Sequence, residues 1–280
     1  MAVERIEGAS DPRVAAWRDV RDGELLRARG LFVAEGRLVV RRVLEEERYR
    51  VHSLLVNDAA LSDLSSPLAS IADDVPILVC SARDLAGIAG YHVHRGCLAL
   101  VHRPPPVPID EIVARAQTLV VLEGMSNADN VGGVFRNAAA FGAGGVLLSP
   151  TCCDPLYRKA IRTSMGAALR VPFARAADDD WPGVLLRVRA AGFAIVALTP
   201  REPSETLDAF AARPRPARVA LVAGTEGAGL TPAVESTADY RVRIPISGDV
   251  DSLNVAVATG IALYRLQPRA VILPPVGDSL

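Results

Sequence analysis

The stretch that decides the fold spans residues 118–138 and reads TLVVLEGMSNADNVGGVFRNA. Its apolar start predicts a buried strand, and a polar turn then leads into residues with helical spacing. Ligands of open α/β sheets bind at the carboxyl ends of strands, so the polar turn is well placed for function. Asn130 and Arg136 lie nearly two helical turns apart and could both reach a polyanion. The alternative is an N-capping Asn and a surface Arg.

Further apolar runs alternate with helix-like stretches toward the C-terminus. This alternation predicts an α/β fold with a parallel sheet covered by helices on both faces. A helix from Leu253 to Leu266 should follow the last strand, with Asp251 or Ser252 as its N-cap and Pro268 as its end. The expected strands of this part span residues 118–122, 145–148, 193–198, 219–223 and 241–246.

A proline segment, RPPPVP at residues 103–108, marks the one clear change of composition. Neither a helix nor a sheet interior accepts it, so residues 104–110 are interpreted as a linker. Residues 1–103 then form a small α/β domain, with helical spacing in the first 50 residues and strands at 51–56, 75–80 and 96–101. Residues 111–270 form the second domain, followed by a tail at 271–280.

Composition limits the possible classes of protein. Half of the 280 residues are apolar, enough for large cores, and the formal net charge of −1 provides no global attraction to nucleic acid or membrane. No apolar run has the length of a membrane span, and the first residues lack the apolar core of a signal peptide. The prediction is a cytoplasmic protein without a membrane partner. Four cysteines form no C-x-x-C pair, so neither a metal site nor a disulfide framework is expected.

Two further polar clusters follow predicted strands. Residues 222–230, VAGTEGAGL, place Glu226 among three glycines, which permit close approach of a ligand to the backbone. Their spacing is not the G-x-G-x-x-G of a dinucleotide site, and a simple glycine turn stays open. Residues 244–258 run from a strand into a helix. Ser252 there is a natural N-cap, whereas Asn254, expected inside the first turn, is a poor helix residue without an evident reason.

Residues 130–177 contain six basic residues and one acid, Asp154, for a net charge of +5. This local excess of positive charge could bind phosphates, and a solvated helix surface is the alternative. Lys159 is the only lysine of the chain, so phosphate contacts would be arginine contacts. The basic residues are Arg136, Arg158, Lys159, Arg162, Arg170 and Arg175.

Taken together, these clusters resemble the three motifs of the SpoU/TrmH family of SPOUT RNA methyltransferases, over about residues 118–268. The matching pieces are Asn130 with Arg136, GTEGAG at 224–229, IPI at 244–246 and SLNV at 252–255. In addition, GLFVAEG at 30–36 and RGCLA at 95–99 are similar to the small ribosomal-protein-like RNA-binding domain that precedes many of these enzymes.

The resemblance implies a C-terminal SPOUT domain with a deep trefoil knot, a homodimer, and S-adenosylmethionine as the cofactor. It also implies methyl transfer to a ribose 2′-oxygen, with ribosomal RNA ranked ahead of tRNA as the partner. By position in the motifs, Arg136 is the catalytic arginine, with Asn130, Glu226, Ser252 and Asn254 beside it in the catalytic set. The implied cofactor-binding residues are Gly224, Thr225, Glu226, Gly229, Ile244, Ile246 and Leu253, and the implied RNA-binding residues are Arg158 and Arg162.

Other functions stay open at this point. A base-methylating SPOUT enzyme would share the cofactor site, and a non-catalytic RNA-binding module would share the fold. A nicotinamide dehydrogenase would fit the α/β pattern, but the chain lacks its fingerprint. The intact Asn/Arg and Ser/Asn pairs favour the ribose methyltransferase.

Overall fold

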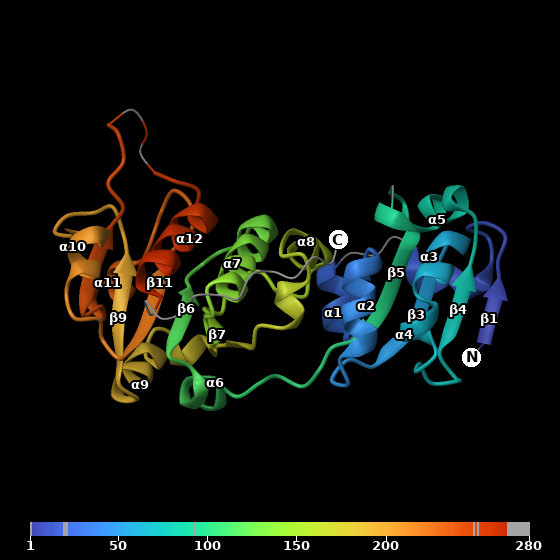
Figure 1. Ribbon diagram of the computed structural model, residues 1–280, viewed down its shortest axis with the longest axis horizontal. Coiled ribbons are helices and arrows are strands. Elements are labelled where there is room, and N and C mark those ends of the chain that lie inside the picture. Colours follow the sequence, from blue (N-terminus) through green and yellow to red (C-terminus); the bar gives the residue numbers. More distant parts are fainter. Residues whose placement is uncertain (1, 19–21, 92, 249, 251, 268–280) are drawn as a thin grey trace. The chain divides into compact units, whose positions relative to one another are not determined.

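The structure is a computed structural model that describes residues 2–18, 22–91, 93–248, 250 and 252–267. These residues pack into two compact units, and each unit is assembled from three separate segments of the chain (Figure 1). Unit 1 contains the described residues of Met1–Pro106, Asn127–Arg136 and Cys153–Arg170. Unit 2 contains those of Val107–Ser126, Asn137–Cys152 and Val171–Leu280.

Unit 1 is built on a five-stranded mixed sheet in the order β1-β4-β3-β5-β2. Strands β1, β4 and β3 are parallel, whereas β5 runs antiparallel to both β3 and β2. The central strands β3 and β5 are almost wholly buried, as strands covered on both faces must be. The strands are β1 (Ala2–Arg5), β2 (Leu31–Glu35), β3 (Val51–Val56), β4 (Pro76–Val79) and β5 (Cys97–His102).

Short helices complete unit 1. In α2, Val39, Val40 and Val43 are buried, which matches the helical spacing seen in the sequence. The α-helices are α1 (Asp22–Arg29), α2 (Arg37–Glu45), α3 (Asp58–Asp63), α4 (Ser65–Leu68), α5 (Ala82–Ala89) and α8 (Arg158–Thr163). The 3₁₀ helices are η1 (Pro12–Trp17), η2 (His94–Gly96) and η3 (Ala167–Leu169).

Unit 2 contains a seven-stranded sheet in the order β10-β12-β9-β11-β6-β7-β8, in which every neighbouring pair is parallel. The expected parallel α/β architecture is therefore confirmed. The strands are β6 (Thr118–Leu122), β7 (Gly145–Leu148), β8 (Phe173–Arg175), β9 (Phe193–Leu198), β10 (Glu205–Thr206), β11 (Arg218–Ala223) and β12 (Tyr240–Arg243).

Helices cover this sheet and form its core. Apolar residues of α6, α9 and α11 pack with inward residues of β6, β9 and β11 in one cluster. Helix α12 packs against β11 and α10. The helices are α6 (Ile109–Arg115), α7 (Ala128–Ala140), α9 (Val184–Ala190), α10 (Leu207–Ala212), α11 (Pro232–Ser236) and α12 (Val255–Leu266), with the 3₁₀ helix η4 (Asp178–Asp180). The first turns of α7 belong to unit 1 and its end to unit 2.

The structure differs from the sequence-based expectation at several strands. Strands β1, β2, β8 and β10 were not expected, because each is short or follows residues with helical spacing. The last strand ends at Arg243, three residues before the expected Ile246, since Pro245 lacks the N–H that a sheet ladder needs. No helix or strand occurs between His102 and Ile109, which fits the proline composition there. The division into domains 1–103 and 111–270 stays a prediction, and the tail at 271–280 lies outside the described residues.

Two glycines of unit 1 provide a test of close packing. A Cβ on Gly132, in α7, would come within 2.6 Å of the Ala160 carbonyl oxygen, whereas a Cβ on Gly87, in α5, would meet nothing within 4 Å. Gly132→Ala should lower the free energy of unfolding by about 1–3 kcal/mol. Gly87→Ala should raise it by about 0.5–1 kcal/mol, because Ala has the better helix propensity. Urea denaturation of both variants checks this, and equal effects would contradict the close approach of α7 and α8.

Candidate functional site

A tight glycine loop follows β11 at the carboxyl edge of the unit 2 sheet. Thr225 and Gly229 pair across it in an antiparallel bridge, and the Gly229 N–H donates to the Thr225 carbonyl over 3.0 Å. A Cβ on Gly224 would lie 2.3 Å from the Gly229 carbonyl carbon, so no other residue fits that position. Gly227 and Gly229 have φ values of +80° and +70°, which favour glycine. The glycines predicted for the cofactor are therefore needed by the loop itself.

Asn254 joins this loop to the start of α12. Its side-chain oxygen accepts the Ala256 and Val257 N–H groups, and its side-chain nitrogen donates to Glu226 Oε1 over 2.8 Å. Asn254 is thus the N-cap of α12, and the expectation that Ser252 caps this helix is wrong. Asp251, the other expected cap, lies outside the described residues.

The segment between β12 and α12 supplies apolar side chains. Ile244 and Leu253 are half-buried, while Ile246 is exposed, as is Ser252. These residues lie in unit 2 with the glycine loop, at a segment that carries neither helix nor strand. An exposed apolar side chain such as that of Ile246 can contact an apolar part of a ligand.

Glu123, at the end of β6, is a buried residue of this region that sequence reasoning did not select. One carboxylate oxygen accepts the Thr231 hydroxyl over 2.8 Å and the Trp181 indole N–H over 3.2 Å, and the other accepts the Thr231 N–H over 2.8 Å. Thr231 directly follows the glycine loop and caps α11. An acid immediately after a buried strand was the signal in the sequence.

Arg201 also contacts the loop. Its guanidinium donates to the Leu230 carbonyl over 2.9 Å and to the Ala228 carbonyl. It lies 3.5 Å from the carboxylate of Glu235, which is 9% exposed. No pattern in the sequence pointed to Arg201, because its partners are backbone groups about thirty residues further along the chain.

Asn130 and Arg136 lie on α7 within unit 1. Asn130 is buried, and the side chain of Asn127, before the helix, accepts the Asp129 N–H over 2.9 Å. The open alternative of a capping Asn130 is therefore wrong, because Asn127 makes the capping contact. Arg136 is exposed and forms no ion pair with any residue that the structure describes.

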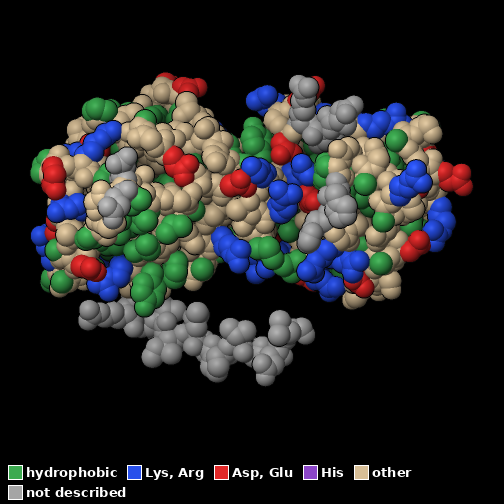
Figure 2. All heavy atoms as spheres, turned by 90° about the horizontal axis from the view of Figure 1, so that it is seen from above, with side chains coloured by type: hydrophobic (Ala, Val, Ile, Leu, Met, Phe, Trp, Pro, Cys, Tyr) green, Lys and Arg blue, Asp and Glu red, His purple; other side chains and the backbone are tan. Residues whose placement is uncertain are grey.

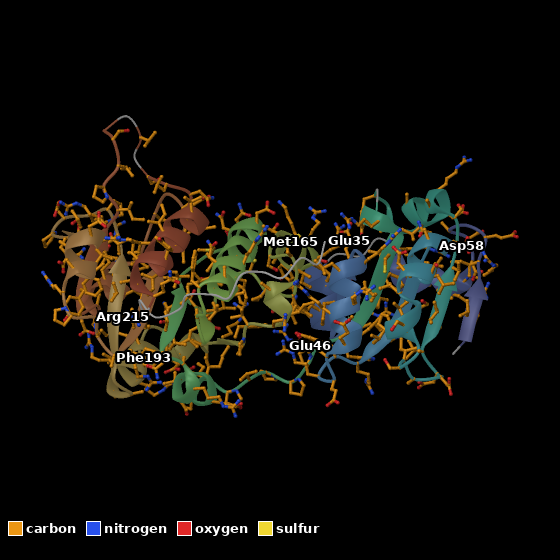
Figure 3. All side chains as sticks on the ribbon, in the orientation of Figure 1. Glu35, Glu46, Asp58, Met165, Phe193 and Arg215 are labelled. Atoms are coloured by element: carbon orange, nitrogen blue, oxygen red, sulfur yellow. The ribbon has the colours of Figure 1, made fainter. Side chains whose placement is uncertain are left out.

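Arg158, at the start of α8, belongs to a partly buried charged cluster of unit 1. It lies 3.1 Å from the carboxylate of Glu35, whose side chain is 1% exposed, and its guanidinium carbon is 3.7 Å from the centre of the Tyr91 ring. Figure 3 labels Glu35 at the sheet of unit 1. Its backbone N–H donates to Asp22 over 3.0 Å. Burial raises the pKa of Asp22, against the opposing effect of Arg158, and burial raises the pKa of Tyr91 to about 12.

Other basic residues of the 130–177 segment also meet partners, and on the face drawn in Figure 2 basic and acidic side chains are interspersed. Lys159 lies 2.6 Å from Asp129, and its hydrogen bond lowers the pKa of that carboxyl group. Arg175 donates to three backbone carbonyls. Arg162 lies 3.8 Å from Glu35 and remains half exposed. Arg158, Lys159 and Arg162 thus lie next to carboxylates, whereas Arg175 meets backbone carbonyls and Arg136 is exposed.

No cluster of metal-ligating side chains occurs among the residues that the structure describes. In the same residues, no helix is long and apolar enough to cross a membrane.

Comparison with known proteins gives consistent matches. Residues 117–264 match the model of the SpoU rRNA Methylase family. The chain is 41% identical over 259 residues to an uncharacterized tRNA/rRNA methyltransferase of Mycobacterium bovis, covering 91% of this chain and 88% of that protein. A protein of Mycobacterium tuberculosis strain H37Rv with the same description matches equally well.

Two solved structures share the fold over nearly the whole chain. The AdoMet-bound rRNA methyltransferase from Sinorhizobium meliloti has a TM-score of 0.78 at 24% identity and covers 94% of this chain and 97% of its own. An RNA 2′-O ribose methyltransferase has a TM-score of 0.75 at 26% identity, with 94% and 98% covered.

The capping role of Asn254 leads to a prediction. Asn254→Ala removes the cap and should lower the free energy of unfolding by about 1 kcal/mol. Ser252→Ala should change it by less than about 0.5 kcal/mol, because Ser252 does not cap α12. Glu226→Ala removes the acceptor of the Asn254 side-chain N–H but leaves the bonds of Asn254 to α12 in place, so its loss of stability should be smaller than that of Asn254→Ala. Urea denaturation of the three variants gives their free energies of unfolding. A larger loss of stability in Ser252→Ala than in Asn254→Ala would contradict the assignment of Asn254 as the cap.

Proposed function

Because the chain belongs to the SpoU rRNA methylase family, we propose that it transfers a methyl group from S-adenosylmethionine to a ribose 2′-oxygen of RNA. The observation that carries this proposal is the hydrogen bond between Asn254 and Glu226, which ties the glycine loop to the start of α12. It joins two of the motifs on which the family resemblance rests. The AdoMet bound to the Sinorhizobium meliloti structure supports the choice of cofactor.

The residues of unit 2 fit this cofactor. The Gly224–Gly229 backbone, with Thr225, can offer peptide groups to adenine and ribose, because the glycines leave no side chains in the way. Ile244, Ile246 and Leu253 supply half-buried or exposed apolar surface for the adenine ring. When bound, the cofactor supplies a sulfonium-activated methyl group.

The chain's own residues must orient the ribose and manage its proton. A bound S-adenosylmethionine would supply the methyl group and leave as its thioether, and the proton of the 2′-hydroxyl would pass to water. We assign Arg136 to an RNA phosphate, because a guanidinium stays protonated and is a poor base. Asn130, Ser252 and Asn254 then serve as positioning groups, together with Glu226.

The RNA substrate is proposed to be ribosomal RNA ahead of tRNA. The family model names rRNA, and the relatives are described as tRNA/rRNA methyltransferases. The structural likeness to an RNA 2′-O ribose methyltransferase favours the ribose over a nucleobase. A base-methylating enzyme would instead leave methyl groups on nucleobases, and a non-catalytic module would transfer none. With RNA as its substrate, the protein is proposed to act in the cytoplasm.

The N-terminal residues 1–103 are proposed to bind RNA, as in the ribosomal-protein-like domain that they resemble. Arg162, half exposed beside the buried Glu35, is proposed to contact RNA phosphate. Arg158 is assigned to the same surface, although its guanidinium is already engaged by Glu35 and Tyr91. A trefoil knot at the C-terminal end of the catalytic domain is proposed by the same family resemblance.

We also propose a homodimer that uses α12. Val257, Ile261 and Tyr264 lie on one face of this helix at helical spacing and are between 38% and 58% exposed. An apolar stripe of this kind costs free energy when it faces water, and a second copy of the chain would cover it.

The decisive experiment is methyl transfer by the purified protein to RNA, with the products mapped for ribose 2′-O-methylation. Arg136→Ala should lower the rate by at least about 100-fold, because it removes charge stabilisation on the RNA side. The affinity for S-adenosylmethionine, measured by calorimetry, should stay within about twofold. Arg187→Ala, which replaces an exposed arginine on α9 of unit 2, is the control. Loss of cofactor affinity together with activity would contradict the role of Arg136, and methyl groups on nucleobases would contradict the ribose assignment.

A second prediction concerns the dimer. Ile261→Glu places a charge in the α12 stripe and should raise the dimer dissociation constant by at least about 10-fold in sedimentation velocity. Leu186→Glu is the matched control, because Leu186 is also exposed but lies on α9. An unchanged dimer in Ile261→Glu, with the fold verified by circular dichroism, would exclude this face.

A further inference from the structure

The loop from Gly224 to Leu230 is held from outside by side chains at two places. Glu123 holds its C-terminal end through the hydroxyl and N–H of Thr231. Arg201 holds the Ala228 and Leu230 carbonyls. Glu123 follows β6 and Arg201 lies after β9, and these two strands are the neighbours of β11 within the sheet.

The Arg201 side chain is half exposed, but its guanidinium is held by an ion pair with Glu235. Glu235, behind it, accepts the Thr199 hydroxyl over 2.8 Å and pairs with Arg241. The Arg201 N–H in turn donates to the Thr199 hydroxyl over 3.3 Å. Because Glu235 is nearly buried and has several donors around it, its carboxylate fixes the direction of the guanidinium.

The glycines alone do not fix this loop. A Cβ on Gly227 would meet nothing within 4 Å, and one on Gly229 would meet only Arg201, so little packing restrains either residue. Glycine also has the largest backbone entropy to lose on ordering. A planar guanidinium that binds two carbonyls restrains the peptide groups between them and thereby orients their N–H groups.

We propose that Arg201 is a positioning residue of the cofactor site, which holds the Gly224–Leu230 loop in its binding conformation before the cofactor arrives. The inference rests on the proposed function in that the ligand of the loop is S-adenosylmethionine. Ordering the loop in advance lowers the entropy that cofactor binding must otherwise cost. Arg201 acts through the loop backbone and not through the reacting atoms.

The test uses the full chain with Arg201→Gln, and Arg187→Gln as the matched control. Arg187 is exposed and pairs with Asp180, so its replacement removes an arginine contact elsewhere in unit 2. Amide hydrogen exchange of residues 224–231 is measured without cofactor, and affinity for S-adenosylmethionine is measured by calorimetry. Arg201→Gln should speed exchange in the loop by about 10-fold and weaken cofactor binding by about 10-fold, the effect of about 1.4 kcal/mol. Arg201→Lys should recover only part of both, because an ammonium lacks the planar fork.

Each outcome separates the inference from the proposed function. Loop exchange that is unchanged in Arg201→Gln overturns the positioning role, and so does faster exchange with unchanged cofactor affinity. Equal effects in Arg187→Gln would do the same, because they would reflect a general loss of stability. If the unsubstituted protein binds no S-adenosylmethionine, the proposed function fails and this inference fails with it, whereas the exchange data still report whether Arg201 orders the loop.

Discussion

A single buried carboxylate, that of Glu123, determines where the glycine loop can lie. The Glu123 N–H donates to the Ala223 carbonyl at the end of β11, next to the start of the loop, and its side chain accepts two bonds from Thr231 after the end of the loop. One residue therefore contacts both ends of the loop. Parallel pairing of β6 and β11 makes this possible, because it places their carboxyl ends side by side. Without the carboxylate, the partly buried hydrogen bonds from Thr231 and Trp181 would be lost, and the loop would lose its link to the end of β6.

Arginine serves this fold as a structural donor. Arg175 donates to three carbonyls near β7, Arg218 donates to the carbonyls of Val113, Ala116 and Ala191, and Arg201 binds two carbonyls of the glycine loop. A guanidinium has five donors and stays charged when half-buried, which suits it to loop carbonyls that no strand can pair. Nearly all basic residues of this chain are arginines, since it has a single lysine. Because several of these arginines bind backbone carbonyls, a count of basic residues overstates how many can contact RNA.

The sequence predicts the sheet of unit 2 better than the contacts that shape its site. Strands such as β6 and β11 are apolar runs bounded by glycine or polar residues, so their existence follows from composition and period. The cap of α12 was misplaced because Ser252 and Asn254 are both good capping residues, and only the path of the chain decides between them. Arg201 and the Arg158–Glu35 pair act across about 30 and 123 residues respectively, and no local pattern encodes such contacts. The same holds for the packing of α8 with the first 106 residues.

The position of Asn254 has a chemical reason. Its side-chain amide oxygen accepts two N–H groups of α12, while its side-chain amide nitrogen donates to Glu226. Asp would cap the helix equally well but has no donor for a carboxylate, and it would place two negative charges together. Ser has one short hydroxyl, which cannot span both partners at once. The amide is thus the capping group that can join the helix start to the acid of the glycine loop. The positive end of the α12 dipole then also favours the negative charge of Glu226. Asn is unfavourable inside a helix, but at position 254, directly before the first residue of α12, it both caps the helix and binds Glu226.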